Sequence, residues 1–84
     1  METLASTNYG NEQIIATEKD FSDTEILYGW IIEIMNSEST LTDEGKAYIK
    51  NEIGYKKFID EFSEKNPEMA TDEDFESLCA AIFK

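Results

Sequence analysis

Eight acidic side chains and a single lysine, Lys65, occupy the segment from residue 60 to residue 76. The eight are Asp60, Glu61, Glu64, Glu68, Asp72, Glu73, Asp74 and Glu76. On a helix, carboxylates one turn apart lie about 5–6 Å from each other, a spacing similar to that of neighbouring phosphates on a nucleic-acid strand. Rows of exposed carboxylates can occupy the basic groove of a nucleic-acid-binding protein. These eight residues are therefore the predicted partner-binding residues.

The residue types that many catalytic and metal sites need are missing from the sequence. The chain has neither histidine nor arginine, so it can build neither a Ser-His-Asp arrangement nor a bidentate clamp for phosphate. The acidic run at 72–76 lacks the D-x-[DN]-x-[DN]-G signature of a calcium-binding loop, and it is typical of the first turn of a helix. We expect no catalytic residues, no cofactor and no metal, and therefore a protein that is not an enzyme.

Two side chains with potential for reactivity or recognition, Cys79 and Trp30, fall within apolar stripes. Cys79 lies between Leu78 and Ile82 on one helical face, where a thiol packs as a small hydrophobe and its pKa rises. Trp30 lies in the middle of a stripe with helical spacing over 26–35, which favours a core position for its indole ring. We expect both side chains to pack in the core.

Capping signals predict where two of the helices that carry these residues begin. The first helix is expected over 23–36, with Ser22 as N-cap and Glu25 completing a capping box. A second box of this form opens a C-terminal helix at Thr71. On both the C-terminal helix and the one before it, the acidic residues fall opposite or beside the apolar stripe, so they should be exposed.

The helix between these two is expected over 42–65. Thr42 is its predicted cap, and Pro67 cannot continue it. Gly54 marks a kink or a break into two shorter helices. Three helices with one apolar stripe each predict an all-α fold, a small three- or four-helix bundle.

Length and charge limit the organisation and the partners of the chain. Its 84 residues suffice for one small domain, expected as a helical domain over 21–84 after a weakly patterned segment 1–20 that contributes at most a short extra helix or strand. A formal net charge of −12 disfavours direct binding to nucleic acid or to anionic membranes. One cysteine, with no signal-peptide or membrane-span pattern, favours a cytoplasmic location. The oligomeric state stays open.

The segment Ser22–Gly29, with the sequence SDTEILYG, is similar to a segment of the small uracil-DNA glycosylase inhibitors of Bacillus phages. Those inhibitors are acidic mimics of DNA, so the resemblance implies that class of action. It covers eight of the 84 residues. Thr24 stands where the family has the phenylalanine that plugs its enzyme, so the plugging role does not transfer to this chain.

The leading interpretation is a small acidic protein that acts by stoichiometric protein binding and presents carboxylates to a basic nucleic-acid-binding or nucleic-acid-processing partner. A DNA-mimic-like inhibitor, such as a phage anti-defence or anti-CRISPR protein, is its concrete form. The alternative is a helical interaction module, such as an immunity protein, an antitoxin-like regulator or an assembly subunit, that binds through an apolar patch. Candidates for that patch are Tyr9, Tyr28, Ile32 and Phe83. The salt dependence of partner binding distinguishes the two interpretations, because screening weakens binding that depends on charge.

Overall fold

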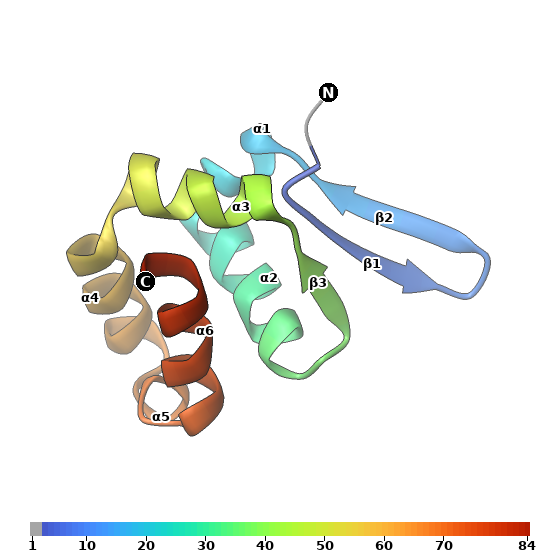
Figure 1. Ribbon diagram of the computed structural model, residues 1–84. Coiled ribbons are helices and arrows are strands. Elements are labelled where there is room, and N and C mark those ends of the chain that lie inside the picture. Colours follow the sequence, from blue (N-terminus) through green and yellow to red (C-terminus); the bar gives the residue numbers. More distant parts are fainter. Residues whose placement is uncertain (1–2) are drawn as a thin grey trace. The chain divides into compact units, whose positions relative to one another are not determined.

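The computed structural model of the protein describes residues 3–84, which form two compact units (Figure 1). The first unit ends at Gly45, and the second comprises Lys46–Lys84. Met1 and Glu2, which belong to the expected segment 1–20, lie outside the described residues.

Strands are confined to the first unit, and helices occur in both. In chain order the elements are β1 (Ala5–Tyr9), β2 (Glu12–Ala16), α1 (Glu18–Phe21), α2 (Thr24–Met35), β3 (Ser39–Leu41), α3 (Asp43–Tyr48), the π-helical turn η1 (Ile49–Ile53), α4 (Tyr55–Lys65), α5 (Pro67–Ala70) and α6 (Glu73–Phe83). Helix α3 runs across the boundary between the two units.

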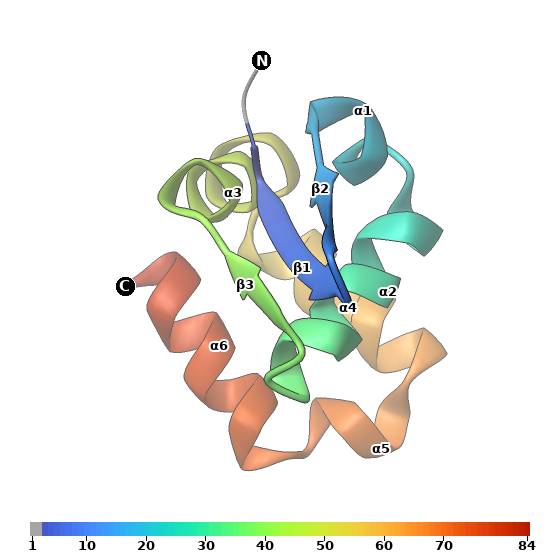
Figure 2. The same cartoon turned by 90° about the vertical axis from the view of Figure 1, so that its right-hand side faces the viewer.

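A β-hairpin begins the first unit. Strands β1 and β2 pair antiparallel with Tyr9 opposite Glu12, so Gly10 and Asn11 form a two-residue turn. Gly10 has a φ of 61°, which favours glycine at the first position of a type II′ hairpin turn. Strand β3 pairs antiparallel with the other edge of β1, which gives the order β2-β1-β3 (Figure 2).

Helices α1 and α2 follow the hairpin and pack on the sheet. Ala5 of β1 lies opposite both Ala16 and Leu41, and these three residues are buried together with Leu27 and Ile31 of α2. Because partners in register share a face of the sheet, these residues form the core between the sheet and α2. The far end of the hairpin extends away from α1 and α2 (Figure 1).

Hydrogen bonds close both ends of α2. Asp23 is its N-cap and accepts from the Glu25 N–H at 3.0 Å. At the other end the Glu38 N–H donates to the Glu33 carbonyl at 3.0 Å, and Ser37 has a φ of 63°. This is the geometry of a Schellman motif, which turns the chain from α2 into β3.

Thr42 connects the start of β1 to the start of α3. Its hydroxyl oxygen lies 2.7 Å from the Thr3 carbonyl oxygen and 2.9 Å from that of Leu4, and it accepts from the Gly45 N–H at 3.0 Å. Gly45 is buried, and a Cβ at this position would overlap the Leu4 carbonyl oxygen. The close approach of the two segments therefore requires glycine, and the predicted cap at Thr42 is confirmed.

An aromatic core organises the second unit. Phe58 and Phe62 of α4 stack on Phe75 of α6, with ring centroids 5.9 and 4.4 Å from that of Phe75, and all three side chains are buried. Gly54 has a φ of 87°, and its N–H donates to the carbonyl of Ile49, five residues earlier. This π-type hydrogen bond and the left-handed φ at glycine confirm the predicted break at Gly54.

The predicted all-α bundle is wrong, because a three-stranded antiparallel sheet forms part of the first unit. Two of its strands lie within the segment that shows weak patterning in the sequence, and the third lies in the polar stretch after the first predicted helix. Strand β2 buries only Ala16 of its five residues, so it lacks the alternating apolar pattern by which a half-buried strand is recognised.

Two of the predicted helix caps are wrong by one residue. Asp23 and Asp72 are the N-caps of α2 and α6, in place of Ser22 and Thr71. The hydroxyls of Ser22 and Thr71 instead donate to carbonyls at the ends of α1 and α5, for which these two residues are the C-caps. Neither one-turn helix is predicted from the sequence, so their C-cap residues were assigned as N-caps of the helices that follow.

Candidate functional site

The structure places the eight predicted acidic residues in the second unit. Asp60, Glu61 and Glu64 belong to α4, and Glu68 belongs to α5. The remaining four are the N-cap and the first turn of α6, namely Asp72, Glu73, Asp74 and Glu76. Seven of the eight are exposed, as helical periodicity predicts, and Glu61 is half-buried. We call these eight residues the acidic surface.

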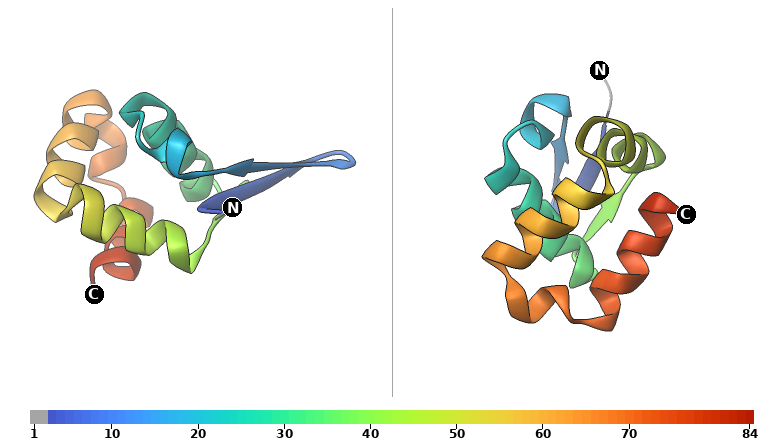
Figure 3. Two further views of the ribbon diagram at one scale, coloured as in Figure 1. Left: turned by 90° about the horizontal axis from the view of Figure 1, so that it is seen from above. Right: turned by 90° about the vertical axis from the view of Figure 1, so that its left-hand side faces the viewer.

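Part of the acidic surface lies where three helices meet. Short helix α5 contacts both α4 and α6, and it joins the end of α4 to the start of α6 (Figure 3). Glu64 lies next to the last residue of α4, and Asp72 immediately precedes α6. Glu64, Glu68 and Asp72 therefore lie near the connections between these helices, whereas Asp60 and Glu61 lie in the middle of α4.

Helix-start stabilisation accounts for only part of the acidic surface. Asp72 accepts from the Asp74 N–H at 2.9 Å, and the acids of the first turn of α6 interact favourably with the helix dipole. Glu64, in contrast, lies in the last turn of α4, where the same dipole disfavours a negative charge. The carboxylate of Glu64 therefore does not stabilise the helix that carries it.

Much of the negative charge lies outside the acidic surface. Residues 1–45 contain ten of the 19 acidic residues. They contain only one of the seven lysines, Lys19. In the second unit, four lysines precede the acidic surface along the chain: Lys46, Lys50, Lys56 and Lys57. The charge density of a single segment does not reveal the acidic first unit, but a count of charges for each half of the chain does.

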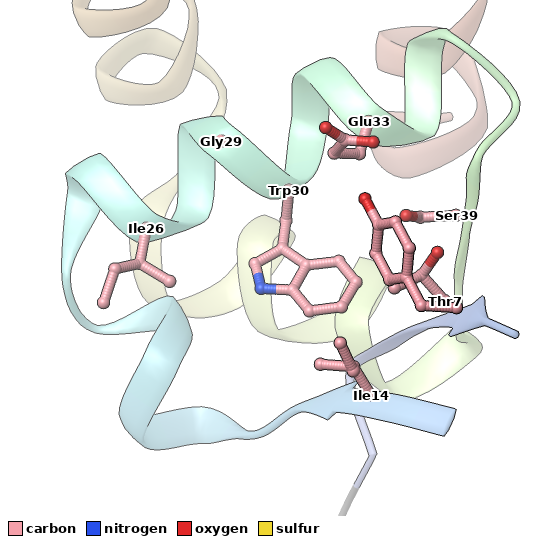
Figure 4. A pocket seen from close by; sticks show the side chains of 8 residues that line it. Thr7, Ile14, Ile26, Gly29, Trp30, Glu33 and Ser39 are labelled. Carbon is pink, nitrogen blue, oxygen red and sulfur yellow. The ribbon is translucent and has the colours of Figure 1, made fainter. Parts of the chain in front are cut away.

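The first unit also contains an open groove of about 340 Å³ between the sheet and α2 (Figure 4). The sheet contributes Thr7, Tyr9, Ile14 and Ser39 to its lining. Helix α2 contributes Ile26, Gly29, Trp30 and Glu33. We call this feature the Trp30 groove. Its lining is mainly apolar and aromatic, with Glu33 as its carboxylate, which suits binding of an apolar group that carries a neighbouring positive charge.

Several apolar residues of α2 occupy other positions than the sequence predicts. Trp30 is half-buried in the groove instead of packed in the core, and Ile26 of the predicted buried stripe is 44% exposed. Tyr28, a predicted patch residue, is 2% exposed and belongs to the core. Apolar residues occur around much of the circumference of α2, because the helix packs on the core with one side and borders the groove with another.

The other predicted patch residues differ in exposure. Tyr9 is 60% exposed at the end of β1, whereas Ile32 and Phe83 are half-buried. The ring of Phe83 lies 5.8 Å from that of Phe58 and 5.1 Å from that of Tyr55. Phe83 therefore extends the aromatic core of the second unit, and only Tyr9 of the predicted patch borders the groove.

Ser39 adds a polar feature to the Trp30 groove. Its Oγ is buried and has no hydrogen-bond partner, the only side-chain oxygen or nitrogen in residues 3–84 found in that state. Buried hydroxyls are nearly always hydrogen-bonded, so an exception requires an explanation. Figure 4 shows Ser39 beside Thr7 and on the side of the groove nearest Glu33.

Cys79 is buried in the second unit, as predicted for this side chain. Burial raises the pKa of its thiol from 9.0 to about 11, because a thiolate is poorly solvated in apolar surroundings. At pH 8 the fraction of thiolate should therefore be about 100-fold lower in the folded protein than in the unfolded chain. We expect alkylation by iodoacetamide to be slower by at least this factor in buffer than in urea.

Labelling at pH 8 in buffer and in urea, followed by mass spectrometry, checks this expectation. Because Cys79 is the only cysteine, the variant Cys79→Ala measures background labelling. Equal rates in buffer and in urea would show that the thiol is accessible and normally acidic in the folded state.

Metal, membrane and family signals are absent from the part of the chain that the structure covers. No group of three or more Cys, Asp or Glu side chains within residues 3–84 is placed to hold a metal ion. No helix in that range has the length and apolar character needed to cross a membrane. Comparison of the chain with protein-family models, with curated proteins and with solved structures found no match.

Proposed function

We propose that the protein is a binding protein rather than an enzyme, and that it acts in the cytoplasm by stoichiometric association with a basic nucleic-acid-binding or nucleic-acid-processing protein. The acidic surface on α4, α5 and α6 takes the place of a nucleic-acid strand in the basic groove of that partner. The outcome is inhibition by mimicry of DNA, the type of action expected of a phage anti-defence or anti-CRISPR protein.

The observation that carries this proposal is the exposure of seven of the eight acidic residues along α4, α5 and the start of α6. Same-sign charges at this density repel each other and lower stability, and Glu64 also opposes the dipole of its own helix. Exposed carboxylates on neighbouring helices steer a basic partner and accelerate association. A role in binding explains why the chain tolerates these costs.

Charge reversal of the acidic surface tests the proposal. The variant carries four substitutions at exposed positions, leaves the Asp72 cap intact, and consists of Asp60→Lys, Glu64→Lys, Glu68→Lys and Glu76→Lys. Wild-type protein immobilised on a resin first captures basic proteins from nuclease-treated bacterial lysate, and the eluted partner is purified. We expect the variant to bind that partner about 100-fold more weakly, because charges that attract it now repel it.

A matched control separates the acidic surface from net charge alone. It makes the same change in net charge at four exposed positions elsewhere, Glu18→Lys, Glu25→Lys, Glu44→Lys and Glu52→Lys. We expect the affinity of the control for the partner to lie within a few-fold of that of the wild type. Binding of the wild type should weaken about tenfold between 50 and 200 mM salt, and DNA should compete with it. Equal losses in both variants, or no loss in either, would contradict the proposal.

A second candidate function is an interaction module that binds through apolar contacts, in the manner of an immunity protein, an antitoxin-like regulator or an assembly subunit. The exposed aromatic and aliphatic lining of the Trp30 groove favours it. A partner that stays bound at high salt and is not displaced by DNA would support this candidate over DNA mimicry, because apolar burial is not weakened by screening.

A further inference from the structure

The outer edge of β2 offers its backbone to an additional strand. In the order β2-β1-β3, β2 pairs only with β1, and residues 12–15 are exposed. Ile14 and Ile15 are 44% and 41% exposed and, as neighbours on a strand, point to opposite faces of the sheet. Exposed edges are normally protected by charges, proline or bulges. In β2 only Glu12, at the very start of the strand, carries a charge.

The Trp30 groove begins at this same strand. Ile14 of β2 points into the groove towards Trp30 (Figure 4), so a strand added beside β2 would place alternate side chains next to Ile14 and near Ile26. Apart from its chain neighbours and its own helix backbone, no atom lies within 4 Å of the place where a Cβ of Gly29 would stand, which leaves room for an incoming side chain. The unpartnered Ser39 hydroxyl lies in the lining as well.

Charge determines what kind of segment fits this edge. Residues 1–45 contain ten acidic side chains and one lysine, and Glu12 and Glu33 border the edge and the groove. A second copy of the chain would bring a further net charge of −12 against this surface, and like charges across paired strands are destabilising. A basic segment with apolar residues at alternate positions is complementary in both charge and polarity.

We propose that the edge of β2 and the Trp30 groove together bind an extended basic segment of a partner protein. The segment adds as a fourth strand beside β2, inserts an apolar side chain between Ile14 and Trp30, and places its lysines or arginines near Glu12 and Glu33. This site belongs to the first unit and is independent of the acidic surface, so either proposal can fail without the other.

The single tryptophan of the chain provides the readout, because Trp30 lies in the groove. The probe is the tryptophan-free peptide Ac-KLKVKLK-amide, titrated to about 1 mM. We expect a saturable blue shift of Trp30 emission and slower amide hydrogen exchange at residues 13 and 15, whose N–H groups point to the edge that the added strand covers. The peptide Ac-KSKSKSK-amide, which has the same charge but no apolar residues, and the acidic peptide Ac-ELEVELE-amide should give no saturable shift.

Substitution of Gly29 tests whether the peptide binds in the Trp30 groove. Gly29→Leu fills the groove at an exposed helical position that no neighbouring atom crowds, so we expect the protein to fold and to bind the basic peptide at least about tenfold more weakly. Ala81→Leu makes a matched enlargement at an exposed position of α6 and should bind as the wild type does. Circular dichroism confirms the fold of each variant.

Four results would overturn the proposal. The first is the absence of a saturable Trp30 shift with the basic peptide, and the second is an equal response to the peptide without apolar residues. The third is binding that survives in Gly29→Leu and is lost in the four-site reversal of the acidic surface; the peptide would then bind to α4–α6, and the proposed function would stand. Concentration-dependent dimerisation through β2, seen in sedimentation equilibrium, would also overturn it, because a second copy would be the occupant.

Discussion

Replacing Gly45 with alanine is expected to lower the free energy of unfolding by about 3 kcal/mol. A Cβ at this position would overlap the Leu4 carbonyl oxygen and stand 2.7 Å from Cδ1 of Leu41. The Leu41 side chain can shift, but the Leu4 carbonyl is held by the backbone N–H of Thr42 at 3.0 Å and by the Thr42 hydroxyl. Backbone must therefore move, and the junction of β1 with α3 must open.

Urea denaturation followed by circular dichroism measures this loss, which is a large part of the stability of a domain of this size. Gly29→Ala is the matched control, because Gly29 is also helical but is exposed and has open space around its Cβ position. We expect that substitution to raise the free energy of unfolding by up to about 1 kcal/mol, since alanine has the higher helix propensity. A loss of similar size in both variants would mean that helix propensity and backbone entropy, rather than the overlap with Leu4, decide the outcome.

The longer helices were predictable because their signals are local. Thr42, Gly54 and Pro67 each act on the backbone within a few residues, through a cap, a left-handed φ and a missing N–H. The hairpin also had a local signal, the pair Gly10-Asn11 between two five-residue segments, which matches a two-residue hairpin turn. The sequence analysis did not use it, because β2 lacks the alternation of apolar residues that a half-buried strand shows.

The candidate sites were predictable to different degrees for a physical reason. Exposure of most of the carboxylates on α4 and α6 follows from helical periodicity, since they lie away from the apolar stripe of their own helix. The Trp30 groove combines side chains from β1, β2, α2 and β3, which come together only when the sheet forms. The spacing of Trp30 and Ile26 on α2 is compatible with side chains that pack in the core or that line a groove. Only the position of the sheet decides between these two placements.

In the second unit, replacing Phe58 with alanine is expected to lower the free energy of unfolding by about 3–5 kcal/mol. The Phe58 side chain is fully buried, and its ring centroid lies 6.4, 5.9 and 5.8 Å from those of Phe62, Phe75 and Phe83. Its removal leaves a cavity between α4 and α6 and deletes three ring contacts, each of which adds to the burial of apolar area. Because α4 and α6 both carry parts of the acidic surface, the same change should also weaken binding of the basic partner.

Tyr55→Ala is the matched control for this prediction. Tyr55 belongs to the same helix and packs edge-to-face on Phe83 at 5.1 Å, but it is 58% exposed. Its loss should cost about 1 kcal/mol and leave partner binding unchanged. Thermal and urea unfolding of both variants supply the comparison, with Phe58→Leu as an intermediate case that retains most of the buried volume. Equal stabilities of Phe58→Ala and Tyr55→Ala would show that the aromatic core does not hold α4 against α6, and the acidic surface would then lack a fixed arrangement of its carboxylates.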